Sequence, residues 1–201
     1  MRPFSHSLAF APATASAATD PALGDLPVWK LEDLYPAPNS DAFRNDMEKA
    51  LADAKAFEAK WKGGLEAAAG QTGPRGIGAA LAEYEALDDL LGKLGSYAGL
   101  TYFSDTLDPA NGKFFGDAQQ KLTALSSHLL FFALELNRID DAVMDACMLA
   151  DSTAGHYRPW LVDLRLDKPY QLDDKLEELF HDKSTTAFSA WNRLFDETLS
   201  S

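Results

Sequence analysis

Apolar residues recur at steps of three and four along most of the chain, the spacing that places them on one face of an α-helix. The first such run follows Ser40 or Asp41, both good N-cap residues, and it closes at Gly63-Gly64. It predicts an amphipathic helix of about 22 residues, some 33 Å long. Its apolar positions are Phe43, Met47, Ala50, Ala54, Phe57 and Trp61.

Two further long helices are predicted after it. A loop at residues 70–76, rich in glycine and proline, precedes a second helix from Ile77 to about Phe103. Asp108-Pro109 then supplies an N-cap residue and a proline at the first helical position, which opens a third helix. The apolar stripe of this third helix is Phe115, Ala118, Leu122, Leu125, Leu129, Phe132 and Leu136.

Four shorter helices complete the prediction. They begin at Asp140 or Asp141, at His156, at Asp173, and at one of residues 184–186. In the last two, the side chains predicted to face inward are Leu176, Leu179, Phe180, Phe188, Trp191, Leu194 and Phe195. No segment shows the alternation of a β-strand between turn residues. The pattern predicts an all-α fold, a bundle of about six to seven mostly antiparallel helices.

Residues 1–25 differ in composition from the rest, being rich in Ala, Ser and Thr. Ala-Ser-Ala at residues 15–17 resembles a signal-peptidase site, but Pro12 interrupts a short apolar centre. A flexible N-terminal extension is therefore expected, followed by a helical domain over residues 26–201. Two prolines favour an extended start of this domain. The side chains expected to pack it onto the helices are Trp29, Leu31, Leu34 and Tyr35.

The chain carries 31 acidic and 18 basic side chains, which gives a net charge of -13. Such a charge repels a phosphate backbone unless basic residues gather on one face, and here they alternate with Glu or Asp. Nucleic acid is therefore not an expected partner. No apolar run approaches the ~18 residues needed to span a bilayer, since even Leu129 to Leu136 contains Glu135. The sequence predicts a soluble protein with no membrane partner.

Metal-dependent catalysis needs ligands that this sequence does not place together. The His-Glu-x-x-His of a catalytic zinc helix is absent, and the histidines are isolated from one another. They are His6, His128, His156 and His181. Glu178-Leu-Phe-His181 matches the Glu-x-x-His of carboxylate-bridged di-iron bundles, but such sites need a second copy. We interpret this motif as a polar helix face with a histidine near the helix C-terminus.

Other catalytic patterns are also weak. Cys147 is the only cysteine, which excludes an internal disulfide, and its apolar neighbours predict a buried thiol. The sequence has no Gly-x-Ser-x-Gly elbow and no phosphate-binding loop. The pairs Asp88-Asp89 and Glu177-Glu178 are predicted to lie on solvent faces. Aromatic stretches at Tyr97–Phe103 and His156–Trp160 can line a groove for peptide side chains, although core packing is their expected role.

Four stretches carry a resemblance to a known family. They are Trp29–Tyr35, Tyr97–Asp108, His156-Tyr157 and Lys183–Thr198. In order and separation they resemble oligoendopeptidase F, and together they span nearly all of residues 26–199. The last stretch is the most specific, because Ala-Trp-x-Arg-Leu-Phe-Asp-Glu after a serine-containing turn is long and unusual. The resemblance implies the N-terminal region of a helical zinc metallopeptidase, related to thimet oligopeptidase, that cleaves short peptides inside a deep channel.

The catalytic groups of that family have no counterpart in this sequence. Its His-Glu-x-x-His helix, downstream glutamate ligand and transition-state-stabilising groups all lie later in the chain. The resemblance therefore assigns no catalytic residue, no metal ligand and no substrate-binding residue here, and zinc belongs to the full-length, cytoplasmic enzyme. The N-terminal helices are expected to form a channel wall that admits only oligopeptides, with the missing C-terminal catalytic part as partner. The aromatic-rich final helix also favours a fragment, which alone is expected to be inactive.

Two alternatives stay open at this stage. A free-standing helical module could hold peptides or a partner protein in the same groove without cleaving them. An independent metal-dependent bundle enzyme could use Glu178, His181 and residues of other helices. Stoichiometric metal retained after chelation and dialysis would favour the second alternative.

Overall fold

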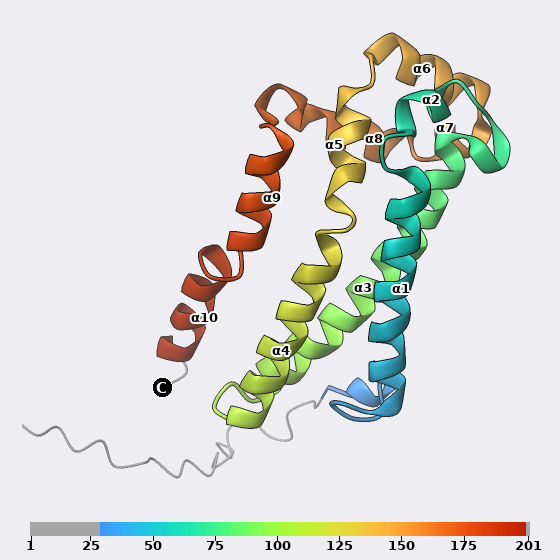
Figure 1. Ribbon diagram of the computed structural model, residues 1–201. Coiled ribbons are helices and arrows are strands. Elements are labelled where there is room, and N and C mark those ends of the chain that lie inside the picture. Colours follow the sequence, from blue (N-terminus) through green and yellow to red (C-terminus); the bar gives the residue numbers. More distant parts are fainter. Residues whose placement is uncertain (1–28, 200–201) are drawn as a thin grey trace, which may run out of the picture. The chain divides into compact units, whose positions relative to one another are not determined.

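A computed structural model describes residues 29–199 of the chain. Leu31 begins the second of two units of the chain, and the helices described below belong to it. Within the described residues every regular element is a helix or a helical turn (Figure 1), which confirms the all-α prediction. The expected extension over residues 1–25 lies outside the described residues, so its boundary with the helical domain stays a prediction.

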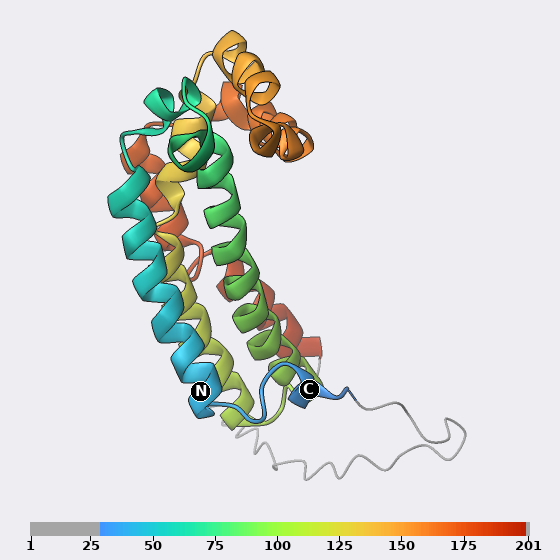
Figure 2. The same cartoon turned by 90° about the vertical axis from the view of Figure 1, so that its right-hand side faces the viewer.

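Three long helices run side by side in both views of the second unit (Figures 1 and 2). They are α1 (Asp41–Trp61), α3 (Ile77–Ser104) and α4 (Pro109–Ser126), and α3 packs antiparallel to the other two. Two of them begin at the predicted caps. The Ser40 side chain accepts a hydrogen bond from the Phe43 amide, and the Asp108 side chain accepts one from the Ala110 amide. The first two predicted long helices are confirmed almost to the residue.

The third predicted helix is interrupted, so its continuation to Leu136 is wrong. α4 ends at Ser126, and α5 (Leu130–Arg138) begins after a short turn. The hydroxyls of Ser126 and Ser127 both donate to the Thr123 carbonyl oxygen, at 3.0 and 3.1 Å. The amides of His128 and Leu129 then donate to the carbonyl oxygens of Leu125 and Ser126, three residues back instead of four, which ends the α-helical pattern. The inward face of α4 also differs from the prediction, because Phe114 is buried and Phe115 only partly so.

The remaining elements are shorter. They are α2 (Leu65–Ala69), α6 (Asp141–Ala150), α7 (Ser152–His156), α8 (Arg158–Leu164), α9 (Asp174–Lys183) and α10 (Phe188–Leu199), with 3-10 turns at Leu31–Asp33, Gly73–Arg75 and Arg165–Tyr170. The helix predicted from His156 to Leu166 is wrong in its start, because α7 ends at His156 and α8 begins two residues later. Pro159 lies in the first turn of α8, where its missing amide proton costs no hydrogen bond.

Aromatic rings form much of the core. Around the first turns of α1, the rings of Tyr35, Phe43, Tyr97 and Phe114 lie with centroids 5.1–6.0 Å apart. The Tyr35 hydroxyl donates to Asp46 Oδ2 at 2.7 Å, and Leu31 and Leu34 pack partly buried beside it. The predicted packing of the N-terminal segment is therefore confirmed for these three side chains. Trp29 lies in the other unit and is 56% exposed, and its packing on the helices stays a prediction.

The last two helices form as predicted but present their apolar side chains outward. The seven residues predicted to face inward are 41–73% exposed, and no residue of α9 or α10 is buried among those described. The expectation that they face a core is wrong within residues 29–199, because no described segment covers this side of the two helices. We refer to Leu176, Leu179, Phe180, Phe188, Trp191, Leu194 and Phe195 as the α9–α10 apolar face.

Candidate functional site

The partial metal motif on α9 does not assemble a metal site. His181 Nε2 lies 3.0 Å from Ser126 Oγ and 3.3 Å from the Thr123 carbonyl oxygen, so this side chain attaches α9 to α4. Glu178 lines a different hollow, beside His128. No three His, Cys, Asp or Glu side chains among residues 29–199 are grouped so that they could hold a metal ion, so these residues do not fit zinc. His6 lies outside the described residues, and the absence of a metal site in the whole chain stays a prediction.

His128 acts in a hydrogen-bonded contact between helices. Its Nδ1 donates to Glu58 Oε2 at 2.6 Å, while Lys62 donates to Glu58 Oε1 at 2.6 Å. Two hydrogen bonds lower the pKa of the Glu58 carboxyl; the one from Lys62 has the larger effect and the one from His128 the smaller. The Gly63 amide donates to Glu135 Oε1 at 2.7 Å and adds a second link. These groups border a hollow of about 260 Å³ and connect the end of α1 to the region of α5.

Replacing Glu58 with glutamine is expected to lower the free energy of unfolding by about 1 kcal/mol at neutral pH. Because the folded pKa of Glu58 is lowered, its contribution is complete above the unfolded value and disappears as the pH falls through the folded value. Urea unfolding of both proteins at neutral pH and at about pH 3.5 measures this difference. Glu48→Gln, at an exposed α1 position with no ion-pair partner among residues 29–199, is the control. An equal difference in the free energy of unfolding at both pH values would show that the ionised form of Glu58 does not stabilise the fold.

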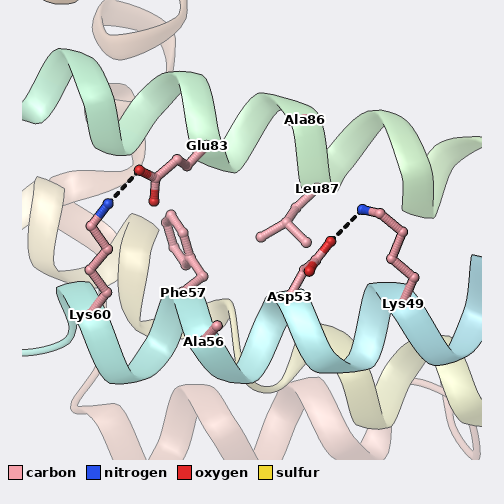
Figure 3. Close-up of a pocket in the computed structure, with 8 residues that line it drawn as sticks. All are labelled: Lys49, Asp53, Ala56, Phe57, Lys60, Glu83, Ala86 and Leu87. Carbon is pink, nitrogen blue, oxygen red and sulfur yellow. Dashed lines mark hydrogen bonds and ion pairs between the residues drawn. The ribbon is translucent and has the colours of Figure 1, made fainter. Parts of the chain in front are cut away.

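The hollow between α1 and α3 has a volume of about 310 Å³. Phe57 and Leu87 face each other across it, between two ion pairs (Figure 3). Lys49 pairs with Asp53 along α1, and Lys60 reaches Glu83 on α3, both at 2.5 Å. Since each charged side chain already has an opposite charge beside it, the net electrostatic field that would attract a charged ligand to this hollow is small. It fits the predicted solvated helix face better than a binding site.

A third hollow, of about 240 Å³, lies between α3 and the start of α8. One wall is a face of α3 with Leu81, Tyr84 and three acidic residues, Glu85, Asp88 and Asp89, and the other has Tyr157 and Trp160. The Tyr157 hydroxyl donates to Glu85 Oε2 at 2.6 Å and joins the two walls. This hydrogen bond, and next burial, raises the pKa of Tyr157 to about 12. We refer to these seven residues as the aromatic-acidic hollow.

From the sequence, the two walls of this hollow were predicted to have different surroundings. Asp88-Asp89 was predicted on a solvent face, which is confirmed by their exposure, and His156–Trp160 was expected chiefly to pack in the core. Trp160 is instead 37% exposed, and it shares the hollow with both aspartates. The spacing of Leu81, Tyr84, Glu85 and Asp88 on one helical face was the only available signal.

An apolar groove continues from this hollow along α3 and α4. It has a volume of about 410 Å³ and shares Asp88 with the aromatic-acidic hollow. Its lining includes Leu91, Phe115 and Leu122, and Gly92, where a β-carbon would meet no atom within 4 Å.

The remaining candidates are structural. Cys147 is buried, which confirms that part of the prediction, and burial raises the pKa of its thiol. Tyr97 and Tyr102 are also buried, as expected for core aromatics, whereas Phe103 is exposed. His156 is exposed and contacts the Tyr157 ring edge-on, with centroids 5.1 Å apart. No helix within residues 29–199 has the length and apolar character needed to cross a membrane.

Part of the chain matches a known protein family. Residues 135–201 match the family model described as oligopeptidase F, in its N-terminal region. No curated protein and no solved structure matches the chain. The matched segment contains α6 to α10, and therefore both the α9–α10 apolar face and the Tyr157–Trp160 wall. The resemblance noted in the sequence is confirmed over residues 135–201, which match the N-terminal region of oligopeptidase F.

Proposed function

We propose that this chain is the N-terminal helical region of a zinc-dependent, cytoplasmic oligopeptidase, and that it forms a wall of the channel in which oligopeptides are cleaved. One observation carries the proposal. The segment that matches the oligopeptidase F family bears seven large apolar side chains that no described residue covers. The proposed occupant of this face is the catalytic part of the same peptidase.

The size of the α9–α10 apolar face favours a large partner. Burying an exposed leucine or phenylalanine side chain contributes about 1.5–3 kcal/mol, and this face has three large apolar side chains on α9 and four on α10. Large exposed apolar surface marks interaction sites in proteins. A catalytic domain that packs on it would close one side of a channel and exclude water from it.

The chemistry is proposed to lie outside this chain. The described residues do not fit a zinc site, and so no step of hydrolysis is assigned to them. In the assembled enzyme, zinc would polarise the peptide carbonyl and activate water. The helices described here contribute the shape of the channel, which admits flexible oligopeptides and excludes folded proteins by its width.

Zinc content and peptide hydrolysis test this division of roles. The purified chain is incubated with zinc, dialysed, analysed for bound metal, and assayed with a quenched fluorescent oligopeptide. We expect no retained zinc and no turnover sensitive to a chelator. One zinc retained per chain together with chelator-sensitive cleavage would refute the proposal and favour an independent metal-dependent bundle enzyme.

Charged substitutions on the α9–α10 apolar face are expected to weaken docking. The partner is the catalytic part of an oligopeptidase F family member, supplied as a separate polypeptide and titrated calorimetrically. We expect Trp191→Glu with Phe195→Glu to weaken binding about tenfold or more, because both side chains would lose their apolar contact. Leu149→Glu with Val162→Glu introduces the same charge at exposed apolar positions elsewhere and is the control. Equal binding by both double variants would show that this face does not dock the catalytic part.

A further inference from the structure

We propose that the aromatic-acidic hollow is a subsite for the basic side chain, lysine or arginine, of a bound oligopeptide. That the peptide is a substrate rests on the function proposed above. The affinity for a cationic side chain depends only on the residues of this chain.

Buried packing holds the rings of the hollow in place. Phe132 is fully buried and lies behind both Tyr84, at a centroid distance of 4.7 Å, and Trp160, at 6.5 Å, with its plane 24° from each. The rings of Tyr84 and Trp160 lie 5.8 Å apart at 41°. The Tyr157 hydroxyl is fixed by its hydrogen bond to Glu85. The aromatic surface therefore exists before a ligand binds, which reduces the entropy lost on binding.

The charge of the hollow has one sign. Glu85, Asp88 and Asp89 contribute three carboxylates, and no lysine or arginine is among the described side chains that line it. Asp88 and Asp89 have no ion-pair partner within residues 29–199. Burial has the larger effect in raising the pKa of the Tyr84 hydroxyl, and the Asp88 carboxylate the smaller. The negative charge of Asp88 is therefore close to the aromatic surface. An anionic ligand is repelled here, and a cation is attracted.

A lysine or arginine side chain matches both properties. A cationic group within about 6 Å of a tyrosine or tryptophan ring is attracted to the face of the ring. The methylene groups of the same side chain can cover the rings while its charged end reaches the carboxylates. A hollow of about 240 Å³ is smaller than most ligand pockets, and this size suits a single long side chain.

The neighbouring groove favours a peptide over a free cation. Asp88 belongs to both the hollow and the apolar groove, so a ligand can extend from one into the other. Glu85 and Gly92 are separated along α3 by about 10 Å at 1.5 Å per residue. An extended peptide covers this distance in about three residues. The preferred peptide therefore has a basic residue and an apolar residue about three positions apart.

Binding of blocked, fluorescein-labelled peptides to the 201-residue chain tests the subsite by fluorescence anisotropy. The probe peptide carries arginine and, three positions away, leucine; the comparison peptides carry glutamine or glutamate in place of arginine. We expect the arginine peptide to bind about five- to tenfold more tightly than the glutamine peptide. Raising the salt to about 0.3 M is expected to reduce this difference, because part of the attraction is between exposed charges.

Matched variants distinguish binding at the subsite from a general effect of the chain's net charge on affinity. We expect two variants, Asp88→Asn with Asp89→Asn and separately Trp160→Leu, to bind the arginine peptide about fivefold more weakly or less tightly still. Their affinity for the glutamine peptide is expected to stay unchanged. Glu48→Gln with Asp145→Asn removes the same charge from exposed positions that have no ion-pair partner among residues 29–199. This control is expected to change affinity less than twofold. Urea unfolding confirms that each variant remains folded.

The outcomes distinguish this proposal from the others. Equal binding of the arginine and glutamine peptides, or an equal loss in the control variant, would overturn the subsite. Spermidine that binds as tightly as the arginine peptide, with the same dependence on Trp160, would identify a free polycation and overturn the peptide assignment. The assay needs neither zinc nor cleavage, so failure of the proposed peptidase function leaves its result intact, and docking of the catalytic part can succeed even if the subsite fails.

Discussion

Replacement of Phe132 by alanine is expected to lower the free energy of unfolding by about 3–5 kcal/mol. Phe132 is fully buried, and its ring lies 5.1 Å from that of Phe57 on α1 and 4.7 Å from that of Tyr84 on α3. It also backs Trp160, so one side chain joins α1, α3, α5 and α8. Its removal leaves a cavity among rigid rings, which cannot collapse fully into the space.

Equilibrium unfolding in urea measures this loss, with the circular dichroism of the helices as the signal. The control is Leu149→Ala, because Leu149 is 81% exposed on α6 and its truncation is expected to change the free energy of unfolding by less than about 0.5 kcal/mol. A loss below about 1 kcal/mol for Phe132→Ala would mean that the aromatic core around Phe132 is not packed as described.

The same substitution at two glycines of α3 is expected to have opposite effects. At Gly78, a β-carbon would lie 2.8 Å from both the Ala154 amide nitrogen and Asp151 Oδ2, where the first turn of α7 crosses α3. Gly78→Ala must push these backbones apart and is expected to destabilise the protein by about 1–3 kcal/mol. At Gly92 a β-carbon meets open space, and Gly92→Ala is expected to stabilise by about 0.5–1 kcal/mol because alanine favours the helix.

Thermal and urea unfolding of the two alanine variants provide the measurement, and each variant is the control for the other. The expected gap between them is about 3 kcal/mol, which is well above the error of either method. Stabilisation by both substitutions would show that α7 does not pack closely on α3. Such a result would also weaken the aromatic-acidic hollow, because α7 leads directly into its Tyr157–Trp160 wall.

The long helices could be predicted from the sequence because their signals are local. The Ser40 cap, the Gly63-Gly64 stop and the six apolar positions between them specify α1 within a single segment of chain. All six of those apolar side chains are buried in the structure. Asp108-Pro109 specifies the start of α4 in the same way. The all-α class follows from such segments, since none of them depends on a distant residue.

The interruption after α4 shows where local signals become insufficient. The apolar stripe continues through Leu125, Leu129 and Phe132 at helical spacing, and periodicity alone gives no reason to end the helix. The helix ends where the amides of His128 and Leu129 donate three residues back instead of four. Contacts of His181 with this turn depend on α9, more than 50 residues later.

The sequence by itself determined the helical class, the bounds of α1 and α3, the start of α4, the apolar face of α1, and the resemblance to oligoendopeptidase F. Only the tertiary structure decided what covers each face. An apolar stripe specifies which side chains avoid water but not which segment packs on them, so α9 and α10 were predicted to face inward and instead lie exposed. The aromatic-acidic hollow likewise depends on a contact between Glu85 and Tyr157, 72 positions apart, which no local pattern encodes.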